Sequence, residues 1–180
     1  MSMVRGVIVA VLVMVEVSAR PGDLGAQGRG AFLQLLEGQW SVTSEATLGP
    51  GQKPVRSESR VVARLLARKW LVAENTGSTP DGQPVTSILT LGHDPAAKRV
   101  VGTWISSMQA HMWSYTGVLN GSGTALTLET EGPILGDPTK KARYREIIEI
   151  ADSDHHTVRS LILGPDGKWF EFARAEYRRM

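Results

Sequence analysis

Cysteine is missing from this sequence of 180 residues, and so is an excess of charge of either sign. Without cysteine the protein forms no disulfide, has no thiolate metal site and cannot use a cysteine nucleophile. The 20 lysines and arginines are balanced by 18 aspartates and glutamates, which leaves a net charge of +2. Basic residues are scattered among acidic ones rather than gathered in the stripe that nucleic-acid binding needs. We therefore expect no nucleic-acid partner.

Motifs for nucleotide binding and nucleophilic catalysis are also missing. No glycine fingerprint sits in a strand–helix–strand context, so neither a phosphate-binding loop nor a dinucleotide site is predicted. The stretch NGSG around Ser122 is typical of a hairpin turn, not of the strand–turn–helix that presents a serine nucleophile. The length suits a single domain that can bury a sizeable core.

One long apolar run is present, at the N-terminus. Residues 6–15 read GVIVAVLVMV, follow Arg5 and precede small residues up to Ala26. A bilayer-spanning helix needs ~20 apolar residues, so the run is too short, and Glu16 ends it. The pattern is typical of a signal peptide over residues 1–26, with a buried strand as the alternative. It predicts a periplasmic or secreted product, without stable membrane insertion after processing.

Residues 27–180 are predicted to form one all-β domain. Residues 20–30 are glycine-rich and indicate a linker, and residues 31–37 indicate a short amphipathic helix that Gly38 stops. After this helix, apolar and polar residues alternate in about ten short segments separated by turn residues. The expected strands are residues 39–48, 55–66, 69–77, 86–92, 99–106, 110–119, 124–130, 143–151, 156–163 and 169–178.

The short connections make these strands antiparallel neighbours. A sheet of about ten twisted strands normally closes on itself, which also removes its edges. The sequence therefore predicts an antiparallel up-and-down β-barrel with a short N-terminal helix. A barrel of that size encloses a cavity unless large side chains fill it. The longer segment 131–142 is either a lid over the barrel mouth or an ordinary surface connection.

The strand expected at 110–119 carries the most unusual face. Alternate residues of a strand share a face, so His111, Trp113 and Tyr115 point one way and Met112 and Ser114 the other. If the first group faces inward, the indole offers a flat apolar surface, and the imidazole and phenol can orient a bound molecule. The alternative is ordinary β-core, because Trp and Tyr are common in strands and His111 lies at a strand end.

A second candidate group surrounds Glu146. This residue shares a face with Tyr144 and Ile148, so an inward orientation would require an inward basic partner or a raised pKa. An inward glutamate beside His111 would form an acid–base pair, whereas the alternative is a cross-strand ion pair on the outer surface. The candidate ligand-binding residues are His111, Trp113, Tyr115, Tyr144, Glu146 and Trp104.

We expect no cofactor and no metal. His155 and His156 are adjacent, so on a strand they face opposite sides and cannot hold one metal together. A metal site would need His111 together with carboxylates gathered from several strands.

Two resemblances agree with the barrel prediction. The helix followed by Gly38-Gln39-Trp40 resembles the Gly-x-Trp opening of lipocalins and other calycins. In those barrels the tryptophan plugs the closed end and a basic residue near the last strand packs over it, which implies this role for Trp40 with Arg178 or Arg179. Residues from about 31 to 180 resemble a bacterial family of unknown function whose members are predicted to form lipocalin-like barrels. The matching stretches are LTLGHDPAAKRVVGTW (89–104), HMWSYTG (111–117), LTLETEGP (126–133), ARYREIIEI (142–150) and GPDGKWFEF (164–172).

The nitrobindins, a related barrel group, are similar in their Gly-x-Trp opening and bind haem through a histidine close to the C-terminus. In this chain the last histidine is His156, and the expected final strand has none. This departure disfavours haem binding.

These observations favour an exported β-barrel that binds a small apolar or amphipathic molecule. One alternative is an enzyme, such as an isomerase, cyclase or hydrolase, that uses the same cavity with His111 as acid or base. Another is a structural or interaction module with a filled barrel. The fold does not decide among them, because one fold can carry many functions.

Overall fold

A computed structural model describes residues 26–47, 52–134 and 137–180 of the protein. Residues 1–25 of the expected signal peptide, which was predicted over residues 1–26, lie outside the described residues. Within the described ranges, no helix is both long enough and apolar enough to cross a membrane.

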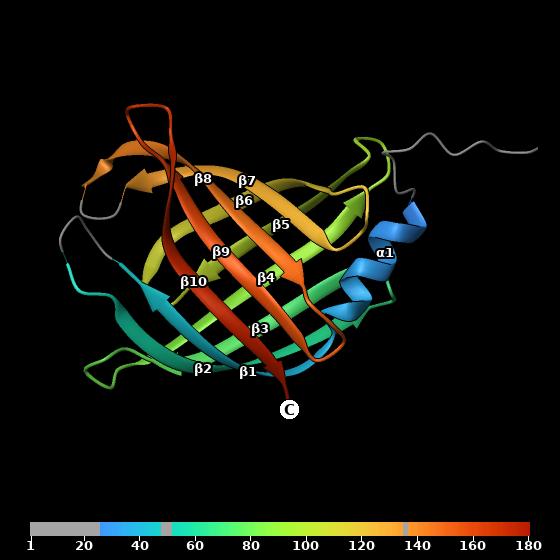
Figure 1. Ribbon diagram of the computed structural model, residues 1–180, viewed down its shortest axis with the longest axis horizontal. Coiled ribbons are helices and arrows are strands. Elements are labelled where there is room, and N and C mark those ends of the chain that lie inside the picture. Colours follow the sequence, from blue (N-terminus) through green and yellow to red (C-terminus); the bar gives the residue numbers. More distant parts are fainter. Residues whose placement is uncertain (1–25, 48–51, 135–136) are drawn as a thin grey trace, which may run out of the picture.

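Ten antiparallel strands close into a barrel, as the sequence predicts (Figure 1). Each strand pairs with the next one along the chain, and the last pairs with the first. Closure gives every strand a neighbour on both sides and leaves no sheet edge. The strands are β1 (Gly38–Ala46), β2 (Val55–Leu66), β3 (Trp70–Ser78), β4 (Pro84–Asp94), β5 (Arg99–Ser106), β6 (Gln109–Leu119), β7 (Ala125–Ile134), β8 (Asp137–Ile150), β9 (His155–Leu163) and β10 (Trp169–Arg179).

The alternation of side chains along each strand separates the interior from the surface. In β2, Val61 and Ala63 are buried inside the barrel, whereas Val62 between them is exposed. The register places Trp40 of β1 opposite Val61 on one side and Arg179 of β10 on the other. These pairings bring the first strand beside the last at the end of the barrel that holds Trp40.

The helix α1 (Ala26–Leu35) begins five residues earlier than the sequence predicts. Residues 26–30 were expected to be a linker because of Gly28 and Gly30, and each glycine costs a helix about 1 kcal/mol relative to alanine. Burial of Phe32, Leu33 and the following Leu36 in the core offsets that cost. The helix lies across one end of the barrel, beside β3 and β4 (Figure 1).

Trp40 closes the barrel beneath α1 and is only 1% exposed. Its indole Nε1 donates to the carbonyl of Leu36 at 3.0 Å. Of the two arginines expected to cover it, Arg179 makes the contact, with Cζ 4.2 Å from the ring centroid. Gly38 is required here, because its φ is +134° and an added Cβ would lie 2.3 Å from Nη1 of Arg179.

The segment 131–142 is mostly strand, not the long loop that the sequence suggested. β7 continues to Ile134 and β8 begins at Asp137, with Gly132 opposite Ala142 and Pro133 opposite Lys141. The glycine and proline were misleading turn signals, because the register shifts after Pro133 and such irregular positions accommodate proline in a strand. A hairpin therefore stands where a lid or a long connection was expected.

Candidate functional site

A cavity of about 820 Å³ occupies the barrel interior. It extends from Leu36 and Trp40 at the helix-covered end to Pro133, Ile134 and Pro138 near the other end. Its walls are mainly aliphatic and aromatic, with few polar groups. Size and lining both fall in the range of small-molecule sites.

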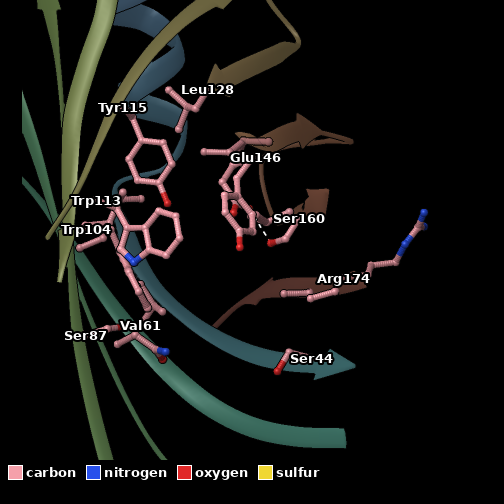
Figure 2. Close-up of a pocket in the computed structure, with 18 of the residues that line it drawn as sticks. Ser44, Val61, Ser87, Trp104, Trp113, Tyr115, Leu128, Glu146, Ser160 and Arg174 are labelled. Carbon is pink, nitrogen blue, oxygen red and sulfur yellow. Dashed lines mark hydrogen bonds between the residues drawn. The ribbon is translucent and has the colours of Figure 1, made fainter. Parts of the chain in front are cut away.

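All six predicted site residues line this cavity, drawn from β5, β6 and β8. His111, Trp113 and Tyr115 face the interior, while Met112 between them is 56% exposed on the outer surface. Figure 2 shows Trp113 and Tyr115 projecting from one wall toward the side that carries Glu146. The inward orientation of the predicted face is correct, and ligand contact by these residues remains a prediction.

Aromatic rings form a connected wall around Trp113. Its ring meets those of His111 and Tyr144 edge to face, with centroids 4.9 Å apart in each case. Tyr144 in turn meets Phe172 at 6.1 Å, and its hydroxyl donates to the carbonyl of Pro133 at 2.8 Å. The contacts hold Trp113 in one orientation, since edge-to-face pairs are favoured over face-to-face stacking.

Glu146 faces the cavity and accepts a hydrogen bond from Ser160 Oγ of β9 at 2.5 Å, drawn as a dashed line in Figure 2. Burial raises the pKa of Glu146 to about 7, although the hydrogen bond from Ser160 opposes this effect. Among the described residues no arginine or lysine pairs with Glu146 to offset this burial. Arg145, next along β8, bonds to Glu129 on the outer surface, and the Arg174 side chain extends outward to Glu171.

Besides Tyr144, the phenol groups of Tyr115 and Tyr177 line the cavity with Glu146. Burial, and secondarily the Glu146 charge, raise the pKa of Tyr115 well above its ordinary value and that of Tyr177 to about 12. Both phenols are therefore neutral at physiological pH. Among the described residues neither hydroxyl of these two tyrosines has a hydrogen-bond partner.

The structure shows no hydrogen bond between His111 and Glu146, the contact that the alternative of an acid–base pair would need, among the described residues. Within the described residues, the hydrogen bond of Glu146 is made with Ser160, and the ring contact of His111 is with Trp113. The imidazole Nε2 and the indole Nε1 of these two residues are buried without a partner among the described residues. The aromatic wall therefore contains two buried nitrogen atoms without a hydrogen-bond partner among the described residues.

His156 occupies the floor of the cavity, a position that the sequence did not single out. Its ring stacks on Tyr177 at 4.3 Å and meets the edge of Trp40 at the same distance. Burial, helped by His155 and Arg179, lowers the pKa of His156 to about 3, so it stays neutral. His155 faces outward, where its Nε2 lies 2.6 Å from Glu176. The prediction that the adjacent histidines face opposite sides is correct.

Other cavity residues were missed for identifiable reasons. Ser160 and Tyr177 follow the inward alternation of β9 and β10, but only the pairing of β8 with β9 places Ser160 opposite Glu146. Regular alternation would place Phe170 and Phe172 on one face of β10, yet Phe170 is exposed and Phe172 lines the cavity. A β-bulge between Glu171 and Ala173 inverts the alternation there.

Within the described ranges, no group of three or more histidine or carboxylate side chains is placed to hold a metal ion. The polar groups of the cavity are spread over several strands, with His111 and Tyr115 on β6, Glu146 on β8 and His156 and Ser160 on β9. Such an arrangement suits the recognition of an organic molecule by hydrogen bonds and aromatic surfaces.

Fold and site together define a closed ten-stranded β-barrel with a hollow, aromatic-lined interior. The chain belongs to the family described as proteins of unknown function, DUF1579, whose model matches residues 26–179. Comparison with curated proteins gave no match.

Two solved structures illustrate what this chain is similar to. The crystal structure of Rv2717c from M. tuberculosis is similar over 87% of this chain and 99% of that chain, with 16% identity and a TM-score of 0.59. A redesigned β-barrel, mFAP1, bound to DFHBI, is similar over 82% of this chain and 97% of that chain, with 18% identity and a TM-score of 0.43.

Proposed function

We propose that this protein binds a small, largely apolar molecule inside its barrel and acts outside the cytoplasm. The observation that carries the binding proposal is the cavity of about 820 Å³, walled by Trp104, Trp113 and Tyr115 and provided with few polar groups. Interiors of soluble domains are normally close-packed, so a space of this size is costly unless it is used. A filled structural barrel does not fit this geometry.

Binding is tested with Nile red, a neutral dye whose emission increases in apolar surroundings. We expect the purified protein to bind the dye, and Ala73→Phe, which places a ring in the cavity, to reduce the affinity at least about tenfold. Thr76→Phe is the matched control, because Thr76 is on the same strand and faces outward. Equal dye binding by both variants would contradict the proposal.

The cellular location is a separate part of the proposal, supported by the apolar run at residues 6–15 after Arg5. Fractionation of cells that express the full chain should recover a shortened protein outside the cytoplasm. Full-length protein in the cytoplasm would refute export without affecting the binding proposal.

A further inference from the structure

We propose that the molecule bound in the barrel is an amphipathic amine, with its protonated nitrogen paired to Glu146 and its apolar body held between the aromatic walls. This inference rests on the proposed binding function and names the class of ligand. It starts from the one acidic side chain among the described residues that line the cavity.

Only one of the two carboxylate oxygens of Glu146 has a hydrogen-bond partner among the described residues. Oε2 accepts the hydrogen bond from Ser160, while Oε1 has no hydrogen-bond partner among the described residues. Arg174 is the only lysine or arginine among the described lining residues. Its guanidinium Nε donates to Glu171 Oε1 at 2.8 Å, outside the interior. Figure 2 shows the Arg174 side chain extending away from Glu146 and Ser160. A buried carboxylate without a cation is thus available to a cation that the ligand brings.

The surroundings of Glu146 also suit a cation. Ring faces attract ammonium groups, and this attraction strengthens where water is excluded. Trp104, Trp113 and Tyr115 line the same cavity, and the hydroxyl of Tyr115 can accept an N–H bond. An anionic ligand would instead be repelled by Glu146 and would find no lysine among the described lining residues, whose single arginine is paired with Glu171.

The protonation of Glu146 gives this inference a characteristic pH dependence. Burial holds its pKa at about 7, so a bound ammonium must compete with a proton below that pH. A neutral ligand that accepts a hydrogen bond from protonated Glu146 would show the opposite trend. The other titratable or charged side chains around the cavity are His111, Tyr115, Tyr144, His156, Arg174 and Tyr177. Any pH dependence of binding that these side chains cause should persist in Glu146→Gln, so binding by this variant is measured at the same pH values.

The test uses three probes with one shared body: 4-phenylbutylamine, 4-phenylbutanol and 4-phenylbutyrate. Binding to the full protein is followed by tryptophan fluorescence, since Trp40, Trp104 and Trp113 line the cavity. At pH 8.5 we expect the amine to bind at least about tenfold tighter than the alcohol, and the carboxylate to bind weakest. Lowering the pH to 5.5 should weaken amine binding about thirtyfold, because a pKa of about 7 leaves a few per cent of Glu146 ionised. Binding of the alcohol should change little, because its hydroxyl can donate to the ionised carboxylate and accept from the protonated one.

Glu146→Gln should abolish both the amine preference and its pH dependence. Glu149→Gln is the control on the same strand, since Glu149 pairs outward with Arg159 at 3.2 Å and should leave both unchanged. Equal affinity for amine and alcohol at pH 8.5, or an amine preference that survives Glu146→Gln, would overturn the inference. Retained Nile red binding in that case would leave the binding function intact, whereas absence of binding by the dye and by all three probes would remove the function itself.

Discussion

Replacing Glu146 with glutamine should make the folded protein more stable, and increasingly so as the pH rises. The buried carboxyl has a pKa of about 7 against an ordinary value of 4.5. A tenfold change in an ionisation constant is worth about 1.4 kcal/mol, so complete ionisation in the folded state costs about 3 kcal/mol. For an acid whose folded pKa is raised, the folded state binds more protons than the unfolded state between the two values, so stability falls as the pH rises through that window.

The comparison must be made between variants, because His156 produces a pH dependence of opposite sign. Its pKa is lowered to about 3, so the stability that it contributes is present above about pH 6.5 and is lost as the pH falls toward 3. This dependence is common to both proteins and cancels in the difference between wild type and Glu146→Gln.

Urea unfolding at pH 5.0 and pH 8.5 provides the measurement. At pH 5.0 about 1 kcal/mol of the Glu146 cost is already present, so the advantage of Glu146→Gln should grow by about 2 kcal/mol between the two pH values. The glutamine can still accept the hydrogen bond from Ser160, which limits other effects. A difference between the two proteins that does not change with pH would refute the reasoning, because Glu146 would then titrate as an exposed carboxyl.

Two further predictions concern the closed end and the aromatic wall. Arg179→Ala should lower the free energy of unfolding by about 2 kcal/mol in urea titrations, because Arg179 covers Trp40 and donates to the carbonyls of Leu35 and Glu37. Arg178 is exposed, so Arg178→Ala should change the free energy of unfolding by less than about 0.5 kcal/mol. Similar losses for both arginines would contradict this assignment. Gly132→Ala should lower the free energy of unfolding by about 2 kcal/mol and weaken Nile red binding, because a Cβ there would lie 2.4 Å from the Trp113 ring. Gly121→Ala serves as the control, because a Cβ at residue 121 would meet no atom within 4 Å. Unaltered dye binding by Gly132→Ala would show that the ring position is unimportant.

Strand alternation made most of the barrel and the predicted cavity face readable from sequence. In β6 the alternation of His111, Trp113 and Tyr115 with exposed Met112 follows from backbone geometry alone. Turn residues between strands were equally informative, because they impose antiparallel neighbours and hence closure. These signals are local, and they predict the structure correctly wherever the strand pairing is regular.

The errors lie where long-range pairing overrides a local signal. Gly132 and Pro133 resemble a loop, but the pairing of β7 with β8 carries the strands through them. The bulge near Phe172 inverts one face of β10, and the pairing of β8 with β9 chooses Ser160 as the partner of Glu146. The sequence identified Glu146 and His111 as possible partners. It could not show which strand would bring a polar atom to the carboxylate.

The unfavourable features of this barrel coincide at one place. Filling the cavity, or replacing Glu146 with a neutral residue, would remove a packing defect and a buried charge. Both features therefore oppose the stability of the empty protein, whereas a bound apolar cation would relieve both, because its body fills the space and its nitrogen pairs with the carboxylate. Sites that violate the rules of stability while the rest of the molecule obeys them are where function is expected. Stabilisation of the folded state should accordingly be greatest for ligands that satisfy both conditions, and smaller for ligands that only fill the space.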